Sequence, residues 1–243
     1  MLSTGTRLVA SVAPRATLEV RALYSEAMSL GVDMVEIRLD ALDELDPRAL
    51  AAELRASGID CGRLVLTYRS PSEGGMSGVP AHDPSVAERV GELRRECPGS
   101  LVDLEVEALG LSGELRRIAT ESRDFLIVSK HYSYLPPMGA AKSDYARMSD
   151  IGRYVKMVFP ASDPRDNLLP ISLQGALGSG RLISFCSGAA GLLSRVLSAV
   201  LGAPLAYVSL PGRPVAEGQL SPRDMASLVE AVASYLGRRG TVI

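Results

Sequence analysis

A lysine, a histidine and a carboxylate in this chain are of the types that act together on a ketone. They are Lys156, His131 and Glu73, and lysine otherwise occurs only as Lys130 and Lys142. A lysine amine kept neutral by nearby arginines and poor solvation attacks a ketone and forms a Schiff base. The protonated imine withdraws electrons, so a histidine can remove the adjacent proton and pass it to a leaving hydroxyl group. A carboxylate such as Glu73 would orient the imidazole ring.

Further charged side chains alternate with apolar ones at the ends of predicted strands. Glu36, Arg38 and Asp40 are two residues apart and therefore share one face of a strand. If these charges pointed at covering helices, they would be buried without partners at a cost of several kcal/mol per ion. Taken singly, Asp40, Asp103 and Glu105 fit structural ion pairs. The whole set on successive strands indicates a polar active site.

Eight short apolar runs recur along the chain, separated by amphipathic stretches of helical period. Strands that alternate with helices pair in parallel, and eight such units predict an α/β fold, a single (β/α)8 TIM barrel that forms one catalytic domain over residues 1–243. An open doubly wound sheet is the alternative, although no Gly-x-Gly-x-x-Gly follows the first run. Asp46, Asp83 and Ser221 each precede a proline and are predicted helix N-caps. The predicted strands are Arg7–Val12, Met34–Leu39, Arg63–Tyr68, Leu101–Val106, Phe125–Lys130, Tyr154–Phe159, Leu182–Ser187 and Leu205–Leu210, and the clearest predicted helices are Thr17–Ser29, Pro47–Ala56, Pro84–Glu96, Gly113–Ser122 and Pro222–Leu236.

The overall charge and the distribution of apolar residues exclude several classes of partner. The 26 Lys and Arg residues against 28 Asp and Glu leave no electrostatic footprint for nucleic acid. The most apolar stretch, Gly188 to Leu210, is interrupted by Arg195, Gly202 and Pro204, so no membrane span is predicted. The first residues lack the apolar run of a secretory signal, and we expect a cytoplasmic protein.

Three cysteines, Cys61, Cys97 and Cys186, occur without Cys-x-x-Cys spacing. Their odd number predicts reduced intracellular thiols rather than a disulfide framework. With two histidines in the chain and no cluster of Cys and His, a zinc site is not predicted. Cys186 lies in a predicted strand and is expected to be a small buried packing residue.

A series of short motifs, in order along nearly the whole chain, resembles type I 3-dehydroquinate dehydratase, the Schiff-base enzyme family of the shikimate pathway. Each motif is weak alone, and their order on a predicted eight-stranded barrel carries the resemblance. The motifs are Val35-Glu36-Ile37-Arg38-Leu39-Asp40, Thr67-Tyr68-Arg69-Ser70 with Glu73-Gly74-Gly75, Asp103-Leu104-Glu105, Ser129-Lys130-His131, Lys156, Ser194-Arg195 and Glu217-Gly218-Gln219.

The resemblance implies a barrel, often a homodimer, that converts the small molecule 3-dehydroquinate to 3-dehydroshikimate and water with no metal or organic cofactor. Lys156 would form the imine with the C3 ketone. His131 would take the C2 proton and assist departure of the C1 hydroxyl group, and Glu73 would orient His131. The implied substrate-binding residues are Arg195 for the carboxylate, Gln219 in the loop after the eighth strand, and Glu36, Arg38 and Arg69 for the ring hydroxyl groups.

Two features depart from the family pattern. Val215, Ala216 and Glu217 stand where the family usually has Ser/Thr-Ala-Pro before Gly-Gln, which removes a hydroxyl group and adds an acidic one. Lys130 beside His131 is also unusual. Strand alternation predicts that Lys130 faces away from the imine site, toward solvent or a helix.

Two other functions fit parts of the same pattern. A class I aldolase or transaldolase would use the same lysine and would need a phosphate site after the seventh or eighth strand. The segment Ser187–Gly191 is a candidate for that site. A non-catalytic barrel that binds a cyclic hydroxy acid is the third hypothesis, and it rests only on the altered loop before Gln219.

Overall fold

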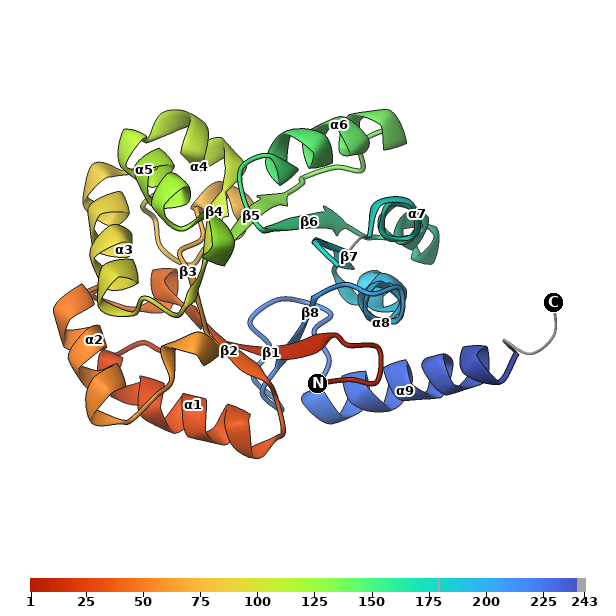
Figure 1. The fold of residues 1–243 in the computed structure, drawn as a ribbon, viewed down its shortest axis with the longest axis horizontal. Helices are drawn as coiled ribbons and strands as arrows, with labels where there is room; N and C mark the ends of the chain where they lie inside the picture. Colours follow the sequence, from red (N-terminus) through yellow and green to blue (C-terminus); the bar gives the residue numbers. More distant parts are fainter. Residues whose placement is uncertain (179, 240–243) are drawn as a thin grey trace.

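A nearly closed ring of parallel strands surrounded by helices forms the body of the protein (Figure 1). It is seen in a computed structural model that describes residues 1–178 and 180–239. The hydrogen-bonded order is β7-β6-β5-β4-β3-β2-β1-β8, with every pair parallel, so the predicted (β/α)8 TIM barrel is confirmed. The strands are β1 (Arg7–Val12), β2 (Met34–Arg38), β3 (Leu64–Thr67), β4 (Leu101–Glu105), β5 (Leu126–His131), β6 (Tyr154–Pro160), β7 (Leu182–Ser187) and β8 (Leu205–Ser209).

The helices begin where the capping signals predict. Asp46 accepts hydrogen bonds from the backbone of Arg48 and Ala49, Asp83 accepts one from Ser85, and Ser221 accepts one from Asp224. These bonds satisfy amide groups that have no partner within the first helical turn. The helices are α1 (Val20–Ser29), α2 (Pro47–Ala56), α3 (Pro84–Glu96), α4 (Val106–Leu111), α5 (Gly113–Glu121), α6 (Met138–Ser149), α7 (Leu168–Leu177), α8 (Leu192–Val200) and α9 (Pro222–Arg239).

Apolar side chains form two separate cores. The larger core lies between the strands and the helices, and the smaller one fills the inside of the barrel. Successive residues of a strand point to opposite faces, so each strand contributes to both cores and is buried along nearly its whole length. The side chains of the inner core are Val9, Met34, Val65, Leu101, Ile127, Tyr154, Val158, Ile183, Phe185, Leu205 and Tyr207.

The most apolar stretch of the sequence folds into ordinary elements of the barrel. It contains α8 and β8, which are joined by a turn at Gly202 with a φ of +87°. Among the residues that the structure describes, no helix combines the length and the hydropathy needed to cross a membrane.

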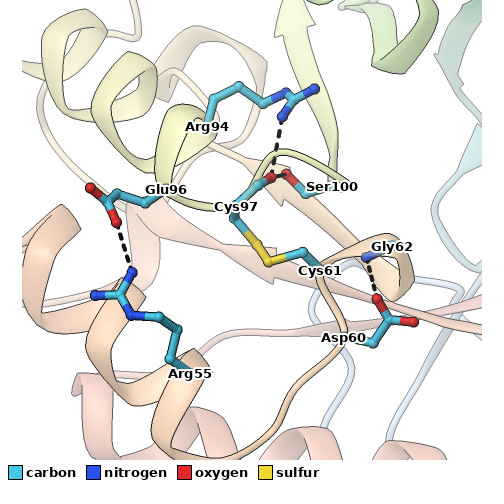
Figure 2. The surroundings of a disulfide bond; sticks show 8 residues. All are labelled: Arg55, Asp60, Cys61, Gly62, Arg94, Glu96, Cys97 and Ser100. Atoms are coloured by element: carbon cyan, nitrogen blue, oxygen red, sulfur yellow. Dashed lines mark hydrogen bonds and ion pairs between the residues drawn. A yellow bond between two sulfur atoms is a disulfide. The ribbon is translucent and has the colours of Figure 1, made fainter.

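The prediction of three reduced cysteines is wrong, because Cys61 and Cys97 form a disulfide bond (Figure 2). Cys61 lies just before β3 and Cys97 follows α3, just before β4. Neighbouring parallel strands start at the same end of a barrel, so residues 36 positions apart in sequence come to a Cα–Cα distance of 5.5 Å. Spacing along the chain could not reveal this pairing. Cys186 is a free, buried cysteine, as predicted.

Candidate active site

A small cavity lies at the carboxyl ends of the strands, where this fold concentrates its polar groups. Its volume is about 70 Å³. A larger cavity of about 540 Å³ lies at the other end of the barrel, around Arg7 and Tyr154, and no predicted site residue lines it. Glu73 lies behind the small cavity, against the ring of His131. The other predicted site residues all line it: Glu36, Arg38, Arg69, His131, Lys156, Arg195 and Gln219.

Lys156 belongs to a layer of four side chains in the middle of the barrel. The layer takes the third residue of each even-numbered strand, namely Glu36, Asp103, Lys156 and Tyr207. Lys156 Nζ donates a hydrogen bond to Asp103 Oδ2 at 3.1 Å and lies 3.6 Å from Glu36 Oε1. All four side chains are buried. The sequence-based expectation of an amine crowded by arginines is therefore wrong at close range, because two carboxylates hold it.

Arg69, which follows β3, connects the carboxylates of the site. Its guanidinium group lies 2.9 Å from Asp103, 3.2 Å from Glu73 and 3.3 Å from Glu105. Burial alone would raise the pKa of Asp103, but the charges of Arg69 and Lys156 outweigh it and lower that pKa to about 2. Burial alone would likewise lower the pKa of Arg69, and the three carboxylates raise it instead. Both terminal nitrogens of Arg69 are thus bound to carboxylates.

His131, at the end of β5, is paired with Glu73. Glu73 Oε2 accepts a hydrogen bond from the backbone N–H of His131 at 3.0 Å and lies 2.9 Å from its Nδ1. Burial, aided by the charge of Glu105, raises the pKa of Glu73 to about 8 although Arg69 opposes it. Burial and the nearby cations Arg69 and Lys156 lower the pKa of His131 well below its ordinary range. Near neutral pH the pair therefore carries no net charge.

A tight turn after β3 places Glu73 under the imidazole ring. Gly74 has a φ of +85°, a left-handed conformation that favours glycine. The next residue, Gly75, donates a backbone hydrogen bond to the carbonyl of Ser70 at 2.9 Å. A Cβ atom on Gly75 would lie 2.0 Å from the carbonyl oxygen of Arg69. The close return of the chain therefore requires glycine at position 75.

Asp40 anchors Arg38 and the turn. Its carboxylate forms two hydrogen bonds with the guanidinium group of Arg38, at 2.8 and 2.7 Å. It also accepts the backbone N–H groups of Arg69 and Met76. Burial alone would raise the pKa of Asp40, but the contact with Arg38 outweighs burial and lowers that pKa. Asp40 is therefore a structural ion-pair partner. This agrees with the interpretation given above for Asp40 when it is taken singly.

Arg195, on α8, differs from Arg38 and Arg69 in having no acidic partner among the described side chains. Its guanidinium group lies 4.6 Å from the centroid of the Phe185 ring and donates to the carbonyl oxygen of Glu217 at 3.2 Å. Burial lowers its pKa to about 10. The Nε atom is buried and has no hydrogen-bond partner in the part of the chain that the structure describes. A buried arginine with spare donors facing a cavity is suited to an anionic group.

The loop after β8 covers the cavity and is fastened by Gln219. The side-chain oxygen of Gln219 accepts the backbone N–H groups of Val215 and Ala216, both at 3.0 Å, and its Nε2 donates to Ser11. Val215 and Ala216 line the cavity, whereas the side chain of Glu217 is exposed. The extra acidic group noted in the sequence therefore points to solvent, and only its backbone contacts Arg195.

Two aromatic residues of the cavity wall are absent from the sequence-based site. Tyr207 on β8 and Phe185 on β7 both line the cavity. Each lies in a buried strand, a position that fits a packing residue equally well. Lys130 behaves as predicted, since it faces outward and pairs with Glu107 and Asp144 on two helices.

Comparisons with known proteins agree with this geometry. The family model of type I 3-dehydroquinase matches residues 8–235. The chain is 31% identical over 202 residues to a 3-dehydroquinate dehydratase of Thermococcus gammatolerans, covering 81% of this chain and 86% of that protein. It is also 31% identical over 199 residues to one of Pyrobaculum aerophilum, covering 81% of this chain but 62% of that protein. The crystal structure of 3-dehydroquinate dehydratase from Geobacillus kaustophilus HTA426 has the same fold, with a TM-score of 0.80 at 22% identity and coverage of 95% and 92% of the two chains.

Proposed function

Because the chain belongs to the type I 3-dehydroquinase family and is therefore a hydro-lyase, we propose that it converts 3-dehydroquinate to 3-dehydroshikimate and water through a Schiff base on Lys156. One observation carries the proposal. A lysine amine, a histidine–carboxylate pair and an arginine without an acidic partner meet at one cavity. The proposed chemistry uses these side chains alone and calls for no cofactor.

Lys156 is the proposed nucleophile. After its amine has lost a proton, the lone pair of Nζ attacks the C3 carbonyl carbon, and the carbonyl oxygen leaves as water. The product is a protonated imine with a positive charge on Nζ. Asp103 and Glu36, at 3.1 and 3.6 Å from Nζ, are in place to balance that charge.

His131 is the proposed base and acid. It takes the C2 proton, and the electron pair of that C–H bond moves into the imine to form an enamine. The same proton then goes from His131 to the C1 hydroxyl group, which leaves as water while the enamine returns to a conjugated imine. Hydrolysis of this imine releases the product and restores Lys156.

The remaining predicted residues receive binding or positioning roles. Arg195 is proposed to bind the substrate carboxylate, because its donors are free of acidic partners. Glu36 and Arg38 are proposed to contact ring hydroxyl groups, with Gln219 closing the cavity. For Arg69 we prefer a positioning role, because three carboxylates already occupy its guanidinium group.

The aldolase alternative gains no specific support. Its phosphate site would use the amide groups of Ser187–Gly191, but Gly188 donates its N–H to Glu217 and Gly191 donates its N–H to Gly188. Nothing in the described residues favours a binding protein over an enzyme in this cavity.

The decisive experiment mixes the protein with 3-dehydroquinate, reduces the mixture with borohydride and maps any added mass by peptide mass spectrometry. We expect an adduct on Lys156, with formation of the conjugated enone in an unreduced sample. Lys156→Ala should lose the adduct and nearly all turnover. Lys130→Ala is the matched control, because this lysine is on the outer face of β5, and it should retain both. An active Lys156→Ala variant would overturn the mechanism.

Assembly as a homodimer and a cytoplasmic location are also proposals, supported by the family likeness and by the sequence composition. Light scattering coupled to size exclusion tests the first. A count of free thiols in protein that is alkylated during lysis tests the second. Three free thiols would support a reducing compartment, whereas one would show that the Cys61–Cys97 bond forms in the cell.

A further inference from the structure

Tyr207 lies directly against the reactive amine. Lys156 Nζ is 4.0 Å from the centroid of the Tyr207 ring, well within the range of a cation–π contact. Both side chains are buried, with 4% of Tyr207 and 5% of Lys156 exposed. The contact is therefore desolvated, the condition under which a cation–π interaction is strongest.

The hydroxyl group of Tyr207 does not explain why the residue is there. It is buried without a hydrogen-bond partner among the described residues. Leaving a buried hydroxyl unpaired is unfavourable. The contact that Tyr207 makes with the described part of the site is therefore the one between its ring and Lys156.

The ring belongs to an aromatic wall between two cations, formed by Tyr207 and Phe185. The two rings are 6.3 Å apart between centroids and tilted by 40°. Phe185 contacts the guanidinium group of Arg195 at 4.6 Å, and Tyr207 contacts Lys156 at 4.0 Å. Each cation therefore lies over one of the two rings, and among the described residues carboxylates pair with Lys156 but not with Arg195.

We propose that the face of the Tyr207 ring stabilises the positive charge on Lys156 Nζ, both in the resting ammonium and in the protonated imine. The charged groups that face Nζ from the surrounding strands are Glu36 and Asp103, with Arg69 bound to the far side of Asp103. A substrate reaches the layer of Glu36, Asp103, Lys156 and Tyr207 by bonding to Nζ. The Tyr207 ring can then stay in contact with Nζ when the positive charge changes from that of an ammonium to that of a protonated imine. The catalytic part of this inference rests on the proposed function.

Three substitutions at position 207 separate the ring from the hydroxyl group and from simple volume. Tyr207→Phe keeps the ring and removes the unpaired hydroxyl, so kcat should stay within about twofold. Tyr207→Leu removes the ring that stabilises the ammonium, so Lys156 should react with cyanate, a reagent for neutral amines, roughly 5- to 30-fold faster, the range of a buried cation–π contact. Thermal unfolding of each variant identifies any loss of folding.

A graded series isolates the electrostatic effect. Phenylalanine with one, two and three ring fluorine atoms at position 207 retains the shape of the side chain while the negative potential of its face declines. The reactivity of the Lys156 amine toward cyanate should rise stepwise along the series. Equal reactivity for all four rings, or a Tyr207→Leu variant that reacts no faster than Tyr207→Phe, would overturn the inference.

This readout does not depend on the dehydratase reaction. Cyanate carbamylates only the neutral amine of a lysine, so a ring that stabilises the ammonium slows carbamylation of Lys156. The rate at Lys156, read by peptide mass spectrometry, should rise along the fluorinated series. If no substrate is turned over but this rise is seen, the proposed function fails and the contact stands. A carbamylation rate that is the same for all the rings would show that the ring does not stabilise the ammonium, even where the dehydratase reaction is confirmed.

Discussion

The protonation state of Glu73 decides which nitrogen of His131 is free to act as a base. When Glu73 is ionised, it accepts a hydrogen bond from the N–H group at Nδ1, and Nε2 keeps its lone pair for the substrate. When Glu73 is protonated, its O–H group donates to Nδ1, and the remaining ring proton is on Nε2, where it blocks proton abstraction. The active pair is therefore the one that has lost the carboxyl proton.

This predicts that activity rises with pH. The raised pKa of Glu73, about 8, means that the inactive protonated form persists through neutral pH and disappears as the pH increases. The value of kcat/KM should climb with a midpoint near that pKa and then level off. A profile measured from pH 6 to 9.5 in buffers of constant ionic strength checks it, and a flat profile would contradict the assigned pair.

Glu105→Gln should move this midpoint to lower pH, because the charge of Glu105 is one cause of the raised pKa of Glu73. A glutamine retains an acceptor for Ser70, which now donates to Glu105. Glu107→Gln is the control, since Glu107 lies outside the barrel and pairs with Lys130. An unchanged midpoint in Glu105→Gln would show that the rise of kcat/KM with pH reports the titration of a group other than Glu73.

At the scale of elements, the turn between β3 and α3 is the piece of backbone on which the proposed catalytic pair, Glu73 and His131, depends. Gly75→Ala would force a Cβ atom to within 2.0 Å of the Arg69 carbonyl, so the turn that holds Glu73 must shift. We expect kcat/KM to fall about 10- to 100-fold, the usual cost of displacing a catalytic group by about 1 Å. Steady-state kinetics on the purified variant give the result.

Gly78→Ala provides the matched control in the same loop. A Cβ atom at Gly78 meets nothing within 4 Å, and this residue does not have a positive φ. Its activity should equal that of the unmodified protein. Equal losses in the two variants would show that the loop tolerates no change at all, and equal retention would show that the turn at Gly75 is adaptable.

At the scale of the whole molecule, the Cys61–Cys97 bond joins the segments that precede β3 and β4, at the end of the barrel away from the cavity. Closing a loop between residues 36 positions apart stabilises the fold by roughly 3–4 kcal/mol in the chain-entropy description. Cys61→Ser/Cys97→Ser should lower the free energy of unfolding by that amount and leave kcat and KM unchanged.

Denaturant unfolding with and without a reducing agent measures the effect. The reducing agent should lower the free energy of unfolding of the unmodified protein. It should not change the free energy of unfolding of the double serine variant. If the two proteins unfold with the same free energy under oxidising conditions, the bond contributes nothing to stability.

Much of this protein follows from the sequence alone, and the reason is that the relevant signals are local. Short apolar runs separated by stretches of helical period predict the eight strands, and a capping residue followed by proline predicts the starts of α2, α3 and α9. Alternation within a strand also predicts that Glu36 and Arg38 share a face and that Lys130 points away from it. The ordered motifs led to the family that the comparisons establish.

The tertiary structure decided everything that depends on distances between strands. Only the barrel shows that Lys156 sits between Asp103 and Glu36, that Tyr207 covers its amine and that Arg195 has no acidic partner among the described residues. Only the barrel brings Cys61 to Cys97. Closing the sheet sets which residues of strands far apart in sequence share a layer, and that register depends on the packing of the whole core rather than on any short segment.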